Sequence, residues 1–188
     1  LGLLGDHTGV GFCNLTPAVI ESFAQQIAAC VKQYNLDGVD FDDEYADYWK
    51  APSNLPSPST TIFGNLVKRV CQLLPDKLIT VFSFGGYTNF DATTMNAISY
   101  MWPDFGADWS TPAGLGNSKW AKMSIHCTDG RPSAGVIQSS AANYSGYGAI
   151  MMFNLRESGQ TSLMNNFASR VWGGKTVSRT TTIYAKNY

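Results

Sequence analysis

Three acidic residues at alternate positions could carry out acid–base chemistry. Asp40, Asp42 and Glu44 lie in the segment LDGVDFDDEY. Side chains of a strand alternate between its two faces, so these carboxylates would share one face at a spacing of roughly 6.6 Å. Val39 and Phe41 would point the other way, into an apolar layer. The pattern predicts a buried strand with a row of carboxylates on one face and Glu44 at its outer end.

Three carboxylates on one inward face interact strongly with one another. Repulsion and poor solvation raise the pKa of such groups, so that some of them hold protons near neutral pH. We expect Asp40 and Asp42 to share a proton and Glu44, further out, to keep a raised pKa. A glutamic acid that is protonated near neutral pH can act as a general acid, and this is the role predicted for Glu44.

The acidic row is also compatible with other kinds of site. An EF-hand loop does not fit, because its sixth position would be Tyr45 in place of Gly and its twelfth Ala51 in place of Glu. The Asp-x-Asp motif of metal-dependent glycosyltransferases fits residues 40–42, but this short pattern is nonspecific. An exposed acidic turn is the third alternative. Since His7 and His126 are the two histidines, a histidine-based metal centre is not expected, and we predict no metal and no cofactor.

Short apolar runs that alternate with helical patterns would position the row. The runs predict six strands, at residues 1–4, 39–42, 78–84, 98–102, 123–125 and 149–153. Helical periodicity with start and stop signals predicts three helices, at residues 17–31, 62–74 and 163–171. Strands that alternate with helices indicate a parallel sheet, either doubly wound or closed as a barrel.

The number of strand units bears on which of the two sheets is formed. Six units in 188 residues give about 31 residues each, and eight such units would need about 250, the usual size of a (β/α)8 barrel. The chain is therefore either one whole domain of another kind or a barrel without its first two units.

The composition excludes several partners. The 13 basic and 14 acidic residues form no basic patch, so nucleic acid is not an expected partner. No apolar run reaches about 18 residues, so no membrane span is expected. Cys30 and Cys71 fall in successive helices and form either a disulfide or a pair of buried thiols. The sequons at Asn14 and Asn143 are compatible with secretion. We expect a secreted monomer.

The segment DGVDFDDE fits the Asp-Gly-x-Asp-x-Asp-x-Glu signature of glycoside hydrolase family 18, and within it resembles the endo-β-N-acetylglucosaminidases of the endoglycosidase H type. Asp43 stands where chitinases usually carry Trp or another bulky residue. Residues 4–12 resemble the end of the family's third strand, and residues 146–155 resemble its eighth. The resemblance implies that residues 1–188 are a partial catalytic domain. It would be an α/β (β/α)8 TIM barrel lacking about the first two β/α units and holding strands three to eight.

The resemblance also implies a mechanism without a protein nucleophile. Glu44 would protonate the glycosidic oxygen, and the substrate's 2-acetamido oxygen would attack the anomeric carbon. Asp42 would hold the acetamido N–H, Asp40 would tune Asp42, and water deprotonated by Glu44 would complete a retaining hydrolysis. The expected substrate is the β-1,4 bond between the two core GlcNAc residues of an N-glycan, with a chitin-type GlcNAc oligosaccharide as the alternative.

Several further residues are candidates for substrate binding. A Tyr that contacts the acetamido group in many members is replaced here by Asp104 or Phe105, and a strand-eight Trp of many chitinases is replaced by Phe153-Asn154. Trp102 and Trp109 would either stack on sugars or pack in the protein, and His7 would either line the cleft or serve a structural role. The full set of predicted substrate-binding residues is Trp102, Asp104, Phe105, Phe153, Asn154 and His7.

Three rival functions remain open at the level of the sequence. A chitinase would share the mechanism, a carbohydrate-binding family member without activity would share the fold, and a metal-dependent glycosyltransferase would need a nucleotide-sugar site. The intact carboxylate row counts against the binding protein. His126, at the end of a predicted strand, would either reach the mouth of the site or pack in the protein.

Overall fold

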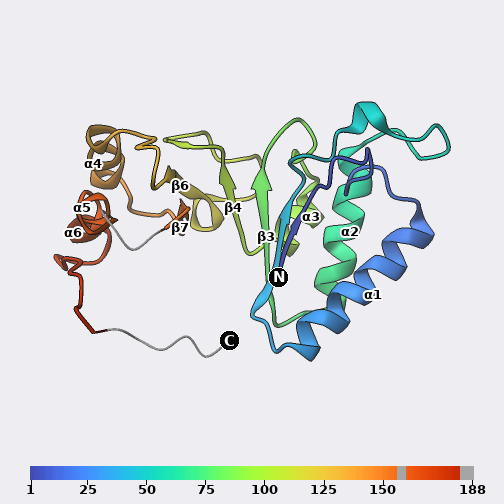
Figure 1. Ribbon diagram of the computed structural model, residues 1–188, viewed down its shortest axis with the longest axis horizontal. Coiled ribbons are helices and arrows are strands. Elements are labelled where there is room, and N and C mark those ends of the chain that lie inside the picture. The colour runs from blue at the N-terminus through green and yellow to red at the C-terminus, as the bar shows by residue number, and fades with distance from the viewer. Residues whose placement is uncertain (156–159, 183–188) are drawn as a thin grey trace.

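The computed structural model describes residues 1–155 and 160–182 and belongs to the α/β class, as predicted (Figure 1). Four parallel strands follow one another in chain order: β1 (Gly2–Leu4), β2 (Gly38–Asp42), β3 (Leu78–Ser83) and β4 (Tyr100–Pro103). A second sheet holds β5 (Gly106–Ala107), β6 (Ala121–His126) and β7 (Ala149–Phe153), in which β6 and β7 are parallel. A parallel bridge between Met101 and Trp120 joins β4 to the start of β6.

All six predicted strands are confirmed, with small differences at their ends. Ile98 was expected to begin the fourth strand, but it is the C-cap of a short helix, and β4 begins at Tyr100. Two-residue β5 was not predicted; it pairs antiparallel with β6. So short a strand lacks the apolar run by which the others are identified.

The helices form where caps and apolar stripes favour them. They are α1 (Pro17–Gln33), α2 (Thr60–Leu73), α3 (Ala92–Ala97), α4 (Ala134–Ala142), α5 (Gln160–Asn165) and α6 (Ala168–Val171), with the 3-10 turns Tyr48–Lys50 and Asn117–Lys119. The side chains of Thr16, Ser59 and Asp91 accept hydrogen bonds from the first turns of α1, α2 and α3. The prediction of one helix at residues 163–171 is wrong in detail. The helix is interrupted at Asn166 and Phe167, so that two short helices, α5 and α6, form instead.

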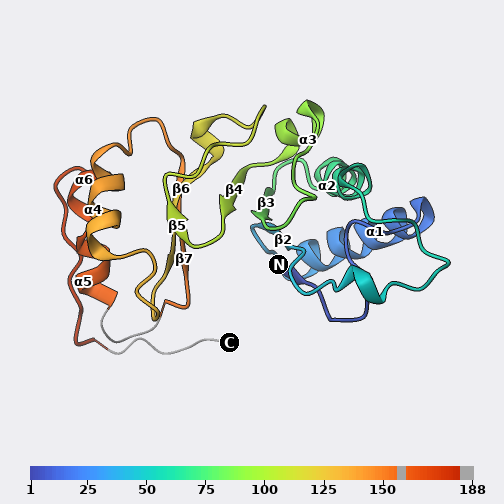
Figure 2. The same ribbon diagram turned by 90° about the horizontal axis from the view of Figure 1, so that it is seen from above.

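Two apolar clusters pack against the sheets on their helical side. In the larger one, α1 and α2 cover β1 to β4, and Phe63 lies within 5.4 Å of Phe12, 5.9 Å of Phe41 and 5.1 Å of Phe90, between ring centroids. In the smaller one, α4 and α6 pack beside β6 and β7. Figure 2 shows the helices of the two clusters at opposite ends of the run of strands. Each sheet therefore has its own core.

Two local predictions from the sequence can be compared with the structure. All four cysteines are free thiols, so the disulfide between Cys30 and Cys71 is not formed, and both residues are half-buried on adjacent helices. Asn14 is fully buried: its side chain accepts from the Gly11 amide at 2.9 Å and donates to the Gly9 carbonyl at 2.8 Å. This sequon is therefore a structural element and no acceptor for a glycan. Among the described residues, no helix is both long and apolar enough to cross a bilayer.

The larger core predicts a clear difference between two aromatic truncations. Phe63→Ala should lower the free energy of unfolding by about 3–5 kcal/mol, because it removes a fully buried ring and leaves a cavity. Tyr34→Ala, at a side chain that is 65% exposed beyond α1, should change it by less than about 0.5 kcal/mol. Chemical denaturation of both variants checks this, and equal losses would contradict the packing described here.

Candidate active site

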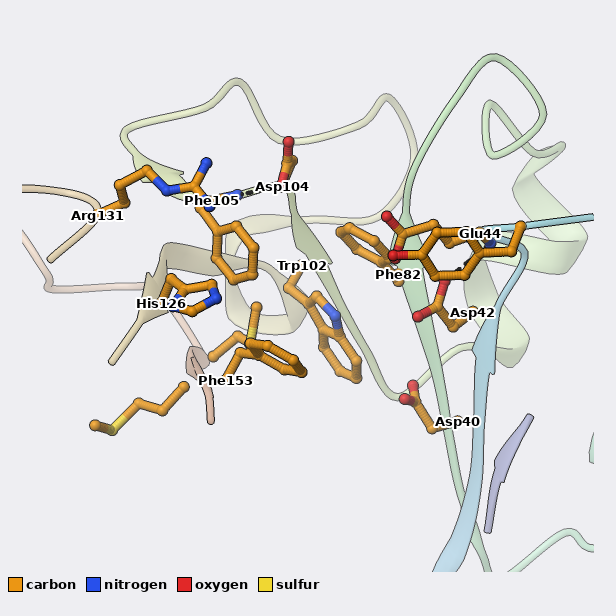
Figure 3. A pocket seen from close by; sticks show the side chains of 13 residues that line it. Asp40, Asp42, Glu44, Phe82, Trp102, Asp104, Phe105, His126, Arg131 and Phe153 are labelled. Atoms are coloured by element: carbon orange, nitrogen blue, oxygen red, sulfur yellow. Dashed lines mark hydrogen bonds between the residues drawn. The ribbon is translucent and has the colours of Figure 1, made fainter. Parts of the chain in front are cut away.

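The end of β2 presents the acidic row to a single cavity. Asp40 and Asp42 point to one face of the strand, while Val39 and Phe41 are buried on the other, at 2% and 0% exposure. Glu44 follows two residues after Asp42, and its amide donates to Asp42 Oδ1 at 2.9 Å. The three carboxylates all line a cavity of about 680 Å³ (Figure 3). The structure thus places the row as the alternation of the strand predicts.

Backbone contacts from the loop after β1 hold the turn that carries Glu44. The amides of Gly5, His7 and Gly9 donate to the carbonyls of residues 44, 45 and 46 at 3.0, 2.9 and 3.0 Å. Gly5 lies so close to the Glu44 carbonyl that a β-carbon would collide with it. The backbone of Tyr45 has a φ of +66°, which residues other than glycine rarely adopt. The turn therefore depends on the hydrogen bonds from the loop after β1.

The two walls of the cavity differ in chemistry. Asp40, Asp42, Glu44, Tyr45 and Phe82 form one wall, from β2 and β3. Figure 3 shows Phe105, His126, Arg131 and Phe153 on the opposite wall, with Trp102 of β4 between the two walls. One wall therefore carries three acids, and the other carries aromatic rings together with Asp104 and Arg131.

The inner two carboxyl groups are held away from bulk water. Burial raises the pKa of Asp40 above its ordinary value, against a hydrogen bond at 2.7 Å from the Thr80 hydroxyl, and the charge of Asp42 raises it further. Burial likewise raises the pKa of Asp42, while the Glu44 amide lowers it and the charge of Asp43 raises it. Within the described part of the chain no hydrogen bond joins Asp40 to Asp42, so the expected shared proton has no direct bridge here.

The surroundings of Glu44 raise the pKa of its carboxyl group. Burial raises its pKa, and the negative charges of Asp42 and Asp104 add to the rise, while a hydrogen bond from Tyr45 opposes it. A raised pKa leaves a larger fraction of Glu44 protonated near neutral pH. In residues 1–155 and 160–182, no cluster of three or more His, Cys, Asp or Glu side chains is arranged to hold a metal ion.

Comparisons with known proteins agree with this geometry. No protein-family model matches the chain. It is 30% identical to endo-β-N-acetylglucosaminidase F1 of Elizabethkingia meningoseptica over the whole chain, and 29% identical to an endo-β-N-acetylglucosaminidase of Flavobacterium sp. (strain SK1022) over 92% of it. This chain is similar to endo-β-N-acetylglucosaminidases. The resemblance to such enzymes that the sequence predicts is thereby confirmed. The chain spans 59% and 57% of the lengths of these two relatives.

Two solved structures share the fold of this chain over its whole length. Bacteroides thetaiotamicron EndoBT-3987 with a Man5GlcNAc product matches all of this chain with a TM-score of 0.77 at 28% identity, over 46% of its own length. The same enzyme in complex with a Man9GlcNAc2Asn substrate matches with a TM-score of 0.76 at 27% identity, over 49% of its length. The relationship to endo-β-N-acetylglucosaminidases therefore extends from sequence to backbone.

The predicted substrate-binding residues divide into two groups. Trp102, Asp104, Phe105 and Phe153 line the cavity, although their roles in binding remain predictions. His7 and Asn154 do not line this cavity. His7 is turned outward with a side chain that is 61% exposed, because its Nδ1 lies 3.0 Å from Asp47 Oδ2.

Asn154 lies just beyond the strand end at Phe153. Its Nδ2 donates to the Thr128 hydroxyl at 3.0 Å, which holds the amide against the loop after β6 and outside the lining of the cavity. A left-handed backbone at Asn154, with a φ of +59°, accompanies this orientation. Asn154 therefore belongs to the rim of the site in this structure.

Sequence analysis named Phe105 and Phe153 of the aromatic wall but missed Arg131. His126 had been left between a packing role and the mouth of the site; it lines the cavity, with ring centroids 4.8 Å from Phe105 and 5.1 Å from Phe153. Arg131 stacks its guanidinium 5.2 Å from the Phe105 ring and pairs with Asp129 at 3.1 Å. His126 and Phe153 are register partners on β6 and β7, but that pairing is tertiary and no local signal predicts it.

The electrostatics of the row predict the effect of removing one charge. Asp42→Asn should lower the pKa of Glu44, because the charge of Asp42 is one of the causes that raise it. The pKa of Glu44 is to be followed by carbon-13 NMR of the carboxyl group. Asp47→Asn is the matched control, since Asp47 pairs with His7 and Lys50 and lies outside the cavity. A Glu44 pKa that rises or stays constant in Asp42→Asn would refute the coupling.

Proposed function

We propose that the protein of which this chain forms part hydrolyses the β-1,4 bond between the two core GlcNAc residues of an N-glycan. The observation that carries the proposal is the convergence of Asp40, Asp42 and Glu44 on one cavity at the end of β2. Relatives named endo-β-N-acetylglucosaminidase support the reaction. The Man5GlcNAc product and the Man9GlcNAc2Asn substrate bound by EndoBT-3987 support an N-glycan as the substrate class.

The proposed reaction uses the substrate's own acetamido group as the nucleophile. Glu44 transfers its proton to the glycosidic oxygen, while the acetamido oxygen bonds to the anomeric carbon and the bond to the leaving sugar breaks. Asp42, as a carboxylate, accepts a hydrogen bond from the acetamido N–H and stabilises the positive charge of the oxazolinium ion. Water then attacks the anomeric carbon and gives a proton to Glu44, while the bond from that carbon to the acetamido oxygen breaks and the acetamido group is restored. Two inversions at one carbon leave the configuration retained.

The fold is proposed to be an incomplete (β/α)8 barrel that spans residues 1–188. Strands β1 to β4, β6 and β7 would correspond to strands three to eight, and β5 would be an addition to the loop after β4. Parallel strands in chain order support this assignment, as does a cavity at their carboxyl ends, where the active sites of such barrels lie. A TM-score of 0.77 over 46% of EndoBT-3987 supports a partial match of the same architecture.

Substrate contacts are proposed from the position of each side chain. Trp102, between the two walls, would offer a ring face to the C–H bonds of a sugar. Asp104 would accept a hydrogen bond from a sugar hydroxyl or amide, and Phe105 and Phe153 would pack against a neighbouring ring. The protein is further proposed to act outside the cell as a monomer.

Replacement of the general acid tests the proposed function directly. Glu44→Gln in the full-length protein should lower kcat by about 10²–10⁴-fold on a high-mannose glycoprotein and leave substrate binding intact, because an amide cannot donate the required proton. The assay compares release of the glycan with release from a chitin oligomer. Glu21→Gln, an exposed residue that pairs with Arg69 on the far side of the core, should retain the wild-type rate.

Each outcome of this assay decides between functions. Cleavage of the chitin oligomer alone would replace the substrate class with that of a chitinase. Binding of GlcNAc oligosaccharides without cleavage of either substrate by the wild-type protein would establish a binding protein in place of an enzyme. Full activity of Glu44→Gln would remove Glu44 from its role.

A further inference from the structure

Behind the acidic row lies a fourth carboxylate that the proposed reaction does not use. Asp43, between Asp42 and Glu44 in the chain, is turned to the opposite side and is partly buried. The Phe12 amide donates to its Oδ1 at 2.9 Å, and the Cys13 thiol donates to its Oδ2 at 3.0 Å. Asp43 does not line the cavity that holds its two acidic neighbours. Its contacts therefore lie inside the protein.

The Tyr48 hydroxyl completes this network. It donates to Asp43, with oxygen–oxygen distances of 2.8 Å to Oδ1 and 2.6 Å to Oδ2, and it accepts from the Cys13 amide at 2.9 Å. One carboxylate thus connects the end of β2 to the loop before α1, through residues 12 and 13, and to the 3-10 turn Tyr48–Lys50. These two segments flank the turn that carries Glu44.

The chemistry of these partners favours a carboxylate anion at Asp43. Phe12, Cys13 and Tyr48 all present donors to its oxygens. Burial raises the pKa of Asp43, and these three hydrogen bonds lower it. Burial and the charge of Asp43 raise the pKa of the Cys13 thiol, so this group keeps its proton and its role as donor.

The turn between β2 and the 3-10 turn needs this kind of support. Tyr45 and Asp47 both have left-handed backbone angles, with φ of +66° and +51°. The amides of residues 5, 7 and 9 hold the turn from the side of β1. Asp43 ties the same turn to the protein interior through side-chain hydrogen bonds. Because Asp43 and Glu44 are adjacent in the chain, a displacement of the Asp43 backbone also displaces Glu44.

We propose that Asp43 is a positioning residue, whose carboxylate fixes the turn that aims Glu44 into the cavity and sets a negative charge behind Asp42. The part that concerns turnover rests on the proposed function. A second consequence does not: since the charge of Asp43 raises the pKa of Asp42, removal of that charge lowers it. A lower pKa of Asp42 in such a variant would show that Asp43 acts through its charge, because a residue that only stabilised the fold would leave this pKa unchanged.

The central variant is Asp43→Asn in the full-length protein. A displacement of about 1 Å at a reacting group can cost about 100-fold in rate, so kcat should fall on the order of 10- to 100-fold. KM should stay constant, because Asp43 lines no part of the substrate cavity. The acid limb of the pH–rate profile should move to lower pH, since the proposed mechanism needs Asp42 ionised and its pKa falls.

Asp42 faces several other charged or titratable groups that line the cavity, and each of them bears on the pH profile. The substitution changes the charge at position 43 alone, and the carboxyl groups among these cavity residues are followed beside Asp42 in the same carbon-13 titration. The charged or titratable groups that face Asp42 are Asp40, Glu44 and Tyr45 on its own strand and turn, and Asp104, His126 and Arg131 across the cavity.

Variants at Cys13 and Tyr48 keep the test decisive if Asp43→Asn does not fold. Cys13→Ser retains a donor to Asp43 and should keep the wild-type kcat, whereas Cys13→Ala should lower kcat severalfold. Tyr48→Phe removes a donor to both carboxylate oxygens and should lower kcat with the charge still present. Equal rates for Cys13→Ser and Cys13→Ala, together with a wild-type rate for Tyr48→Phe, would overturn the proposal.

Val70→Ala is the matched control for loss of stability. Val70 is fully buried in the larger core on α2, and it takes no part in the hydrogen bonds of Asp43 or of the turn that carries Glu44. It should lower the melting temperature while kcat and the pKa of Asp42 stay at their wild-type values. If it reproduces the changes of Asp43→Asn, the role of Asp43 is structural only.

The titration separates failure of this inference from failure of the proposed function. If the full-length wild-type protein cleaves no glycan, the proposed function fails, while a lower pKa of Asp42 in Asp43→Asn still supports the charge behind Asp42. If the wild-type protein is active and Asp43→Asn leaves kcat and the pKa of Asp42 unchanged, only the inference fails.

Discussion

The two faces of strand β2 lie in different surroundings, and this constraint shapes the rest of the protein. One face carries Val39 and Phe41 into the larger apolar core, and the other carries acids that cannot be buried without hydrogen bonds. The parallel strands β1 and β3 pair with the backbone of β2 on its two sides. The side chains of the acidic face are therefore not needed as hydrogen-bond partners for that backbone. The alternation of one strand thus separates a hydrophobic core from a reactive cavity with no more than the thickness of a backbone between them.

The acidic face carries a cost in stability that the surroundings offset. Burial raises the pKa values of Asp40, Asp42 and Glu44 in the folded state, so their ionisation destabilises the fold at pH values above the raised pKa. This part of the stability returns as the pH falls through those values. Thr80 and the Glu44 amide reduce the cost for the inner two groups. Strain in the turn at Tyr45 is held by backbone contacts from the loop after β1.

The sequence predicted the features that depend on local periodicity and not those that depend on loops. Alternation located Asp40, Asp42 and Glu44 on one face, and apolar runs located six strands, because both patterns arise from backbone geometry. Arg131 escaped prediction and the place of His126 stayed undecided, because their position beside Phe105 depends on how the segment after β6 folds back. Helices α3 and α4 escaped it as well, since short segments rich in Ala, Ser and Thr show little apolar periodicity.

The cavity lies between parts of the protein that are stabilised separately. Its acidic wall rests on the larger core, and its aromatic wall rests on the smaller one, with the bridge between Met101 and Trp120 linking their sheets. Substitutions in the smaller core therefore act first on the aromatic wall, and substitutions in the larger core act first on the carboxylate row.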